Sequence, residues 1–324
     1  MKVFFDSIRR RVRRKKWLSA KNVAGARRVR EPFEGAFGGP VFRYNVGPKT
    51  VQPFEPLRGS WGDIAGPAFA GKGRVLVKVN LNSPDPYPAS TSPDTLAAFL
   101  DFLKAEGLTD LVVGDCSGVR DLPTRKVAKK TGLLEAIRGK AEFTAFEEGR
   151  WFTVDIPGRY LRKVTLPEVL FESDLVVSFA NIKSHGLADF SFSMKLAVGF
   201  MHPSERFALH EDHLQEKCVE LSLAVTPDLA VIDGVTAMVT GGPCEGERAD
   251  LSVFLVGRDP FCVDLAAYRE LEGARRTMAD PGNLTRNPFG MRQFSHAVEI
   301  GLGQAVMPEI VDIGDDSIDE GKKP

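Results

Sequence analysis

Two short apolar runs, RVLVKVN (Arg74–Asn80) and DLVVGD (Asp110–Asp115), give the first indication of the architecture. Both runs are rich in β-branched residues and are shorter than a typical buried helix, so each predicts a buried strand. Between them, SPD (Ser92–Asp94) predicts a helix start. Serine caps a helix, proline fits its first turn, and aspartate favours its positive end. The stretch therefore predicts a strand, a helix and a second strand in succession.

The same alternation continues along most of the chain. Further strands are predicted at AEFTAF paired with WFTVDI, and at DLVVSFA (Asp174–Ala180), DLAVIDG (Asp228–Gly234) and LSVFLVG (Leu251–Gly257). Helices are predicted over residues 124–138, at LPEVLFES, and at FCVDLAAYREL (Phe261–Leu271), the last capped and stabilised by Asp259 and Asp264. Continuous apolar strands that alternate with helices predict an α/β fold, with a mostly parallel sheet and helices on both faces.

Four regions differ in composition. Residues 1–30 form a basic N-terminal arm, and residues 31–73, rich in Gly, Pro and Phe, predict an irregular, extended lead-in. Residues 74–272 form the α/β domain. Residues 273–324 predict an irregular C-terminal tail that packs on the domain or trails from it.

The arm holds twelve Lys and Arg residues and one acidic residue, although the whole chain has 43 basic and 43 acidic residues. The rest of the chain is therefore acidic, which argues against a broad nucleic-acid surface on it. Phe4, Phe5, Ile8 and Val12 would share one face of a helix. The arm is thus either a solvated tail or a segment that binds an anionic membrane surface or nucleic-acid phosphates.

Several function classes are excluded by missing motifs. No apolar stretch follows the arginines as in an export signal, and none reaches the ~18 residues of a membrane span. We therefore expect a cytoplasmic protein without a transmembrane segment, at most peripheral at a membrane. No Cys-x-x-Cys pair occurs, so an iron–sulfur cluster is not expected. GPAFAGKG (Gly66–Gly73) precedes a strand and lacks the final Ser or Thr of a phosphate-binding loop.

Polar residues follow the apolar runs, where ligands bind in open α/β sheets. Ordinary turn chemistry would explain any one of these loops, but together they predict a site. We expect the side chains at the strand ends to lie on one rim of the sheet. The strand-end segments are Asn80–Pro84, Asp115–Gly118, Asn181–Gly186, Asp233–Gly234 with Gly241–Pro243, and Arg258–Pro260.

Four of the five histidines lie close together, at His185, His202, His210 and His213. Histidine transfers protons near neutral pH and is the commonest metal ligand. His210 and His213 would share a helix face and, together with His185, could hold a divalent metal. His202 precedes a proline, which predicts a turn and a structural role. For each histidine, a hydrogen-bonded structural role is the competing interpretation.

Lys183, Lys195 and Arg206 surround the histidines in the sequence and would suit a small carboxylate or phosphate ligand. Asp115 and Asp233 are the carboxylates at strand ends and could orient the ligand or cap helices. We therefore predict catalytic roles for His185, His210, Lys183 and Asp115. Substrate-binding roles are predicted for Asn80, Lys195, Arg206 and Asp233. The identity of any cofactor is not indicated beyond the divalent metal.

Five segments together resemble the DUF362 family, over about residues 74–272: VLVKVNLN, LVVGDCSG, DLVVSFANIKSHGLADFSFSMKLAVGF, DLAVIDGVTAMVTGGP and VGRDPFCVDLAA. The resemblance implies no assigned activity. Many family members carry a ferredoxin-like region or an export signal, and neither pattern occurs in this sequence. At the level of fold, the lysine followed by histidine on an α/β sheet is also similar to the N-terminal domain of nickel-dependent lactate racemase-like proteins.

Two functions remain open from the sequence. The first is an enzyme that acts on a small anionic substrate or cofactor by redox or isomerisation chemistry. The alternative is a noncatalytic protein that binds a ligand or assists a redox partner and docks through its basic arm. A closed cavity with perturbed pKa values would favour the enzyme. An open cluster beside an exposed apolar patch would favour the binding protein.

Overall fold

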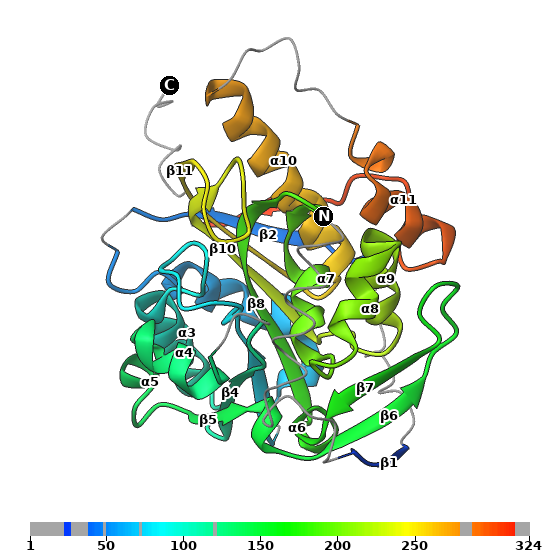
Figure 1. Cartoon of the computed structure of the whole chain (residues 1–324). Helices are drawn as coiled ribbons and strands as arrows, with labels where there is room; N and C mark the ends of the chain where they lie inside the picture. Colours follow the sequence, from blue (N-terminus) through cyan, green and yellow to red (C-terminus); the bar gives the residue numbers. More distant parts are fainter. Residues whose placement is uncertain are drawn as a thin grey trace, which may run out of the picture.

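The computed structural model describes residues 23–26, 38–47, 50–70, 73–118, 122–278 and 287–314. Within these ranges, the main sheet has nine strands in the order β12-β2-β11-β10-β8-β3-β4-β5, with β9 paired to β8 (Figure 1). Five consecutive strands, from β10 to the edge strand β5, are mutually parallel, which confirms the predicted α/β fold. These strands are β3 (Val75–Lys78), β4 (Leu111–Asp115), β5 (Glu142–Ala145), β8 (Leu175–His185) and β10 (Leu229–Met238).

The remaining strands come from both ends of the chain. β11 (Arg248–Gly257) is antiparallel to β10 and to β2 (Val41–Asn45), and β12 (Ile310–Asp312) is parallel to β2. β9 (Asp189–Ser191) is antiparallel to β8. The lead-in and the C-terminal tail thus each add a strand that the sequence analysis did not predict.

The orientation of β11 corrects one expectation. Gly257, its last residue, pairs with Ala230 near the start of β10. The segment Arg258–Pro260 therefore lies at the opposite end of the sheet from the other strand-end loops. There Asp259 caps α10, because its Oδ1 accepts hydrogen bonds from the backbone N of Phe261 (2.8 Å) and Cys262 (3.4 Å).

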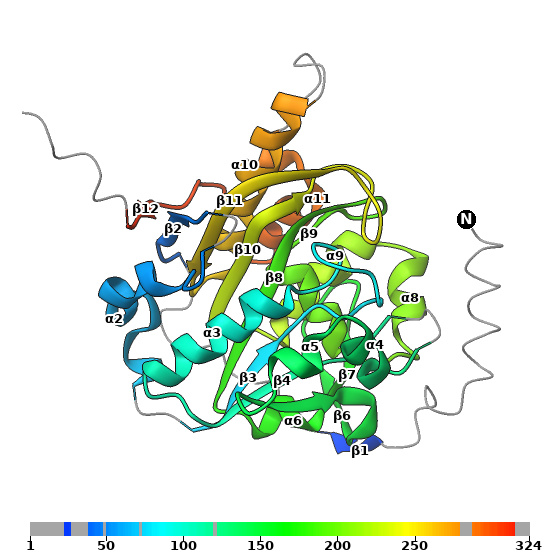
Figure 2. The ribbon, with the colours of Figure 1, turned by 90° about the vertical axis from the view of Figure 1, so that its left-hand side faces the viewer.

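One face of the sheet is covered by α3 (Pro93–Ala105), α4 (Thr124–Lys130) and α5 (Leu133–Ala136), seen from the front in Figure 2. The predicted helix start is confirmed: Ser92 Oγ accepts from Thr95 N at 3.2 Å. The helix predicted over 124–138 is divided in two, because Gly132 adopts φ +82°. The same core contains residues of η2 (Glu55–Ser60), α2 (Trp61–Ala65) and η3 (Gly66–Phe69).

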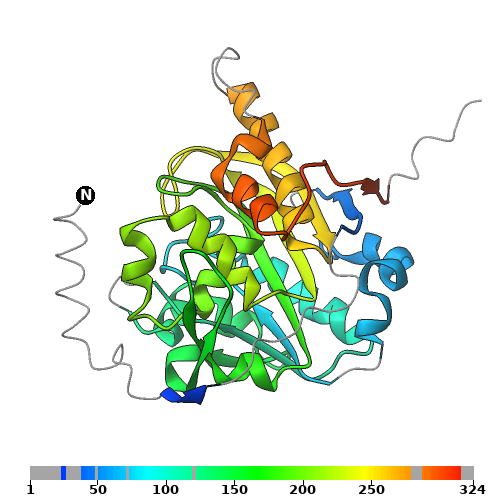
Figure 3. The ribbon, with the colours of Figure 1, turned by 90° about the vertical axis from the view of Figure 1, so that its right-hand side faces the viewer.

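The other face carries a second group of elements (Figure 3). They are α7 (Ser193–Leu196), η5 (Ala197–Phe200), α8 (Arg206–Glu211), α9 (Leu214–Glu220), η6 (Leu221–Leu223), α10 (Pro260–Met278), η8 (Pro288–Gly290) and α11 (Arg292–Glu299). A small sheet, β1 (Val23–Ala26), β6 (Trp151–Asp155) and β7 (Lys163–Pro167), adjoins them, with η4 (Phe146–Glu148) and α6 (Glu168–Glu172). The predicted pairing of AEFTAF with WFTVDI is wrong, because β5 joins the main sheet and β6 pairs with β1 and β7.

Both faces of β3, β4 and β8 are buried, which explains the continuous apolar sequence at the start of these strands. Val75 and Val77 of β3 pack into the core under α3, while Leu76 packs into the core beside the small sheet. Asp264 connects α10 to α7, because its carboxylate accepts hydrogen bonds from the backbone N of Ser193 (2.8 Å) and Met194 (2.9 Å). It therefore caps α7, and not its own helix as the sequence analysis expected.

The basic arm lies outside the described residues apart from β1. The predicted apolar face of Phe4, Phe5, Ile8 and Val12 is therefore not part of the structural description. Val23–Ala26 pairs in parallel with β6, so the end of the arm joins the small sheet. Among the residues described, no helix is both long and apolar enough to span a bilayer.

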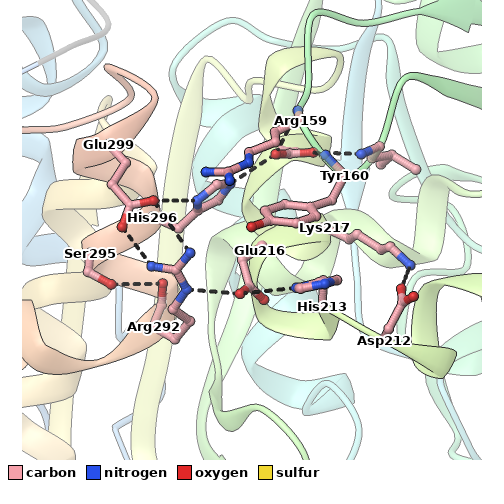
Figure 4. A network of polar contacts seen from close by, with 12 residues as sticks. Arg159, Tyr160, Asp212, His213, Glu216, Lys217, Arg292, Ser295, His296 and Glu299 are labelled. Carbon is pink, nitrogen blue, oxygen red and sulfur yellow. Dashed lines mark hydrogen bonds and ion pairs between the residues drawn. The ribbon is translucent and has the colours of Figure 1, made fainter.

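A polar network holds α11 to the rest of the fold (Figure 4). Glu220, fully buried at the end of α9, accepts hydrogen bonds from the backbone N of Arg159 (2.9 Å), Tyr160 (2.8 Å) and Leu161 (2.6 Å). Its Oε1 lies 2.9 Å from Nε2 of His296 on α11. One carboxylate thus joins α9, α11 and the loop between β6 and β7.

Replacing this carboxylate should destabilise the fold. In Glu220→Ala, three backbone N–H groups and the His296 ring lose their partner, and we expect the free energy of unfolding to fall by about 3–5 kcal/mol. Urea denaturation followed by circular dichroism measures the change. Glu299→Ala, which removes the exposed contact on the other ring nitrogen of His296, is the control and should cost far less. Equal losses in both variants would contradict the central role of Glu220.

Candidate functional site

A cavity of about 480 Å³ opens at the carboxyl ends of β3, β4 and β8. Seven residues singled out from the sequence line it: Asn80, Asp115, Lys183, His185, Lys195, Arg206 and His210. Asp233 and His213 are not among its lining residues. The lining also includes Lys78, Asn82, Cys244 and Glu245, to which the sequence analysis assigned no role.

Lys78 and Asp115 form a buried ion pair at the floor of the cavity. They end the neighbouring parallel strands β3 and β4, and Lys78 Nζ lies 2.7 Å from Asp115 Oδ1. The carboxylate also accepts from the backbone N of Leu81 (2.6 Å) and Cys116 (2.7 Å). Burial lowers the pKa of Lys78, and the adjacent carboxylate opposes that shift. Asp115 thus holds the two loops that begin at Leu81 and Cys116 at the rim of the cavity, and its catalytic role stays a prediction.

Arg206 also serves the rim loops. Its Nη1 donates to the carbonyl oxygens of Cys116 and Ser117, both at 2.8 Å. Nη2 donates to Gly199 O at 2.9 Å, and Nε donates to Met201 O at 3.0 Å. A guanidinium has five N–H donors, and four of those of Arg206 are thus used in hydrogen bonds to backbone carbonyl oxygens. These donors order the loops around the cavity, and the substrate-binding role of Arg206, which lines the cavity, stays a prediction.

Asn80 closes a loop beneath the cavity. Its backbone N donates to Thr91 Oγ1 at 2.8 Å, and its Nδ2 donates to Ala89 O at 2.9 Å. The same carbonyl oxygen accepts a hydrogen bond from Lys183 Nζ at 2.9 Å. Asn80 therefore fixes the backbone group that in turn fixes the amine of Lys183.

Lys183 and Lys195 face the cavity without a counter-ion. They are only 4% and 9% exposed, and neither forms a salt bridge with any carboxylate of the described residues. Burial, together with the positive charge of Lys195, lowers the pKa of Lys183 to about 7. Burial also lowers the pKa of Lys195. The cavity thus contains two desolvated amines that form no ion pair with a described carboxylate.

His185 is held in one tautomer. Its Nδ1 accepts hydrogen bonds from the backbone N of Leu187 (3.1 Å) and Ala188 (3.2 Å). Burial and the nearby Lys195, Lys183 and His210 lower its pKa to about 2, so the ring is neutral. A neutral ring that accepts at Nδ1 carries its proton on Nε2. His185 can therefore donate a hydrogen bond but has no lone pair at Nε2 for a metal.

His210 has the opposite arrangement. Its Nδ1 lies 2.6 Å from the carbonyl oxygen of Arg206, which can only accept, so Nδ1 carries the proton. Burial lowers the pKa of the ring. The basic nitrogen of His210 is consequently Nε2. The cavity therefore contains one imidazole that donates at Nε2 and one that can accept a proton there.

The predicted three-histidine metal site is wrong. His213 begins α9 outside the cavity, where its ring stacks on Tyr160 with centroids 4.1 Å apart. Throughout the described ranges, no three His, Cys, Asp or Glu side chains come together in a way that could hold a metal. His202 lies in a turn against Trp151, with Nδ1 2.7 Å from Ser204 Oγ.

Asp233 is displaced from the rim because β8 and β10 are longer than predicted. β10 runs on to Met238, so Asp233 lies inside the sheet beside Asn181. Its Oδ1 accepts from Tyr87 Oη at 2.7 Å and from Val235 N at 3.0 Å. Burial raises its pKa to about 6. The predicted substrate role of Asp233 is therefore wrong, and the rim after β10 is formed by residues 242–245.

Sequence reasoning overlooked the contributions of Lys78, Cys244 and Glu245. Lys78 stands inside an apolar strand, which was a signal for a buried charge with a partner. Cys244 and Glu245 follow the Gly241–Pro243 turn, which was noted only for its glycines. Cys244 Sγ lies 3.7 Å from Ser83 Oγ.

The fold and the site define a class of α/β protein whose cation-rich cavity lies at the carboxyl ends of parallel strands. The chain belongs to the family described as Domain of unknown function (DUF362), whose model matches residues 75–269.

Two known proteins are similar to the chain. The thylakoid-associated protein sll1697 of Synechocystis sp. (strain ATCC 27184 / PCC 6803 / Kazusa) is 26% identical over 273 residues, which cover 79% of this chain and 81% of that protein. The lactate racemase apoprotein from Thermoanaerobacterium thermosaccharolyticum aligns in structure with a TM-score of 0.40 and 12% identity. That alignment covers 75% of this chain and 58% of the racemase chain.

The ion pair between Lys78 and Asp115 at the floor of the cavity should stabilise the folded protein. Asp115→Ala leaves the Lys78 ammonium buried without a partner, and we expect a loss of about 3–5 kcal/mol in the free energy of unfolding. The double variant Lys78→Met with Asp115→Leu removes both charges and should recover much of that loss. Chemical denaturation of the three proteins measures both effects. A double variant that recovers none of the loss would show that the carboxylate acts mainly through its contacts with the loops.

Proposed function

We propose that the chain is an enzyme that binds a small anionic substrate in this cavity and moves protons on it. The observation that carries the proposal is the pair of buried lysines, Lys183 and Lys195, that face one cavity without a carboxylate partner. An anion would supply the missing counter-charge. The cavity volume of about 480 Å³ falls within the range of small-molecule sites.

The lining suggests a division of roles. Lys195 and the Nε2–H of His185 would bind the carboxylate or phosphate of the substrate, because both are donors that face the cavity. His210, whose basic nitrogen is Nε2, and Lys183, whose pKa of about 7 allows both protonation states, would exchange protons with the substrate. Proton exchange of this kind fits isomerisation better than redox chemistry, because no redox-active group is required.

Anion binding can be tested with small carboxylates and inorganic phosphate. These anions should raise the melting temperature of the wild-type protein. Lys195→Met should weaken binding by at least about tenfold, since a charged hydrogen bond contributes roughly 1.5–3 kcal/mol. Lys163→Met, at an exposed lysine that begins β7 and does not line the cavity, is the matched control and should bind as the wild type does.

The same proteins decide between an enzyme and a binding protein. In D₂O, an enzyme of this type should exchange the hydrogen next to the carboxylate of a 2-hydroxy or 2-oxo acid, which NMR detects. Loss of exchange in His210→Ala, with folding retained, would support catalysis. Anion binding without exchange of any tested acid would instead favour the noncatalytic alternative.

We also propose that the arm docks the protein on an anionic membrane surface. The proposal is motivated by the name of the thylakoid-associated relative and by the twelve Lys and Arg residues in residues 1–30. Basic segments near a membrane gain about 1 kcal/mol per Lys or Arg from anionic lipid.

A truncation that removes residues 1–20 tests this docking and keeps β1 intact. The full chain should sediment with vesicles that contain anionic lipid, and the truncated chain should not. Binding should weaken steeply as salt rises, because screening shortens the reach of surface charge. Vesicle binding that survives the truncation, or a preference for nucleic acid over vesicles, would contradict the proposal.

A further inference from the structure

The cavity contains three buried lysines whose surroundings differ in one respect. Lys78 is paired with Asp115 at 2.7 Å, whereas Lys183 and Lys195 have no such partner among the described carboxylates. A paired ammonium has no lone pair to offer. The two unpaired amines can lose their proton, since the folded protein desolvates their charge without compensating it.

Of these two, Lys183 is the one whose amine has a fixed direction. It extends from near the carboxyl end of β8, where the strand pairs with β10 on one side and β9 on the other, and its Nζ donates to Ala89 O at 2.9 Å. That carbonyl is itself held by Asn80 Nδ2 at 2.9 Å. Lys195 comes from the short helix α7, and no described residue forms a hydrogen bond with its Nζ. The amine of Lys183 is thus held in place by a hydrogen bond, whereas no described residue holds the amine of Lys195 in this way.

We propose that Lys183 is a nucleophile that forms an imine with the carbonyl group of a small 2-oxo acid bound in the cavity. This inference rests on the proposed function, because the carboxylate of the acid would be held by Lys195 and by the Nε2–H of His185. A buried neutral amine beside a second cation is a known arrangement for covalent catalysis on carbonyl compounds. The pKa of Lys183, lowered to about 7, supports the same assignment.

The step balances without any further reactant. The lone pair of the neutral Lys183 amine attacks the carbonyl carbon, and the C=O π pair moves to oxygen. Proton transfer from nitrogen to that oxygen gives a carbinolamine. The hydroxyl then leaves as water with the second amine proton, and a C=N bond remains. His210 Nε2 is placed in the same cavity to relay these protons.

Reductive trapping on the full chain tests the inference. The wild-type protein is incubated at neutral pH with pyruvate and sodium cyanoborohydride, and its peptides are mapped by mass spectrometry. We expect one carboxyethyl group on Lys183. Ordinary lysines should react little, because the neutral fraction at pH 7 is roughly a thousandfold larger for a pKa of about 7 than for one of 10.4. Excess lactate, which has no keto group, should suppress the labelling by competition.

Variants and binding data separate the possible results. Lys183→Arg should abolish the adduct, and the exposed control Lys163→Arg should retain it. An adduct at Lys195, or labelling spread over surface lysines, would overturn the assignment to Lys183. If lactate raises the melting temperature but pyruvate leaves no adduct, the imine is wrong and the anion site stands. If neither acid binds, the proposed function fails as well.

Discussion

The buried ion pair between Lys78 and Asp115 is the constraint on which the cavity depends. It joins the ends of two neighbouring parallel strands, and the same carboxylate anchors the loops that begin at Leu81 and Cys116. Gly199 lies so close to the pair that a side chain at this position would collide with both charged groups. The helix η5 can therefore approach the floor of the cavity this closely only because its residue at position 199 is glycine.

The character of the cavity follows from how charge is distributed around that pair. Asp115 forms an ion pair with Lys78, and Arg206 uses four of its five N–H donors in hydrogen bonds to backbone carbonyl groups. These two cations therefore have few donors left for a ligand. Lys183 and Lys195 line the cavity without an ion pair, so their amines are available to bind a ligand. Desolvation without a counter-ion is unfavourable for folding, and such groups commonly mark functional sites.

Much of the architecture could be predicted from local patterns. The apolar runs identified the central parallel strands, Ser92 identified the start of α3, and Asp259 identified the cap of α10. The site was predicted less completely. The rim after β10 was misplaced, because strand length depends on pairing with a neighbour, and β10 continues beside β8 well past Asp233.

The sequence by itself determined the α/β alternation, the helix caps and the concentration of Lys and His at strand ends, because these signals act between residues a few positions apart. Only the tertiary structure decided which of those groups are partnered. Arg206 donates a hydrogen bond to the carbonyl oxygen of Cys116, 90 residues earlier in the chain. Lys183 donates one to the carbonyl oxygen of Ala89, 94 residues earlier. Such contacts depend on how loops from separate strands converge, and they determine whether a buried cation is neutralised or remains available to a ligand.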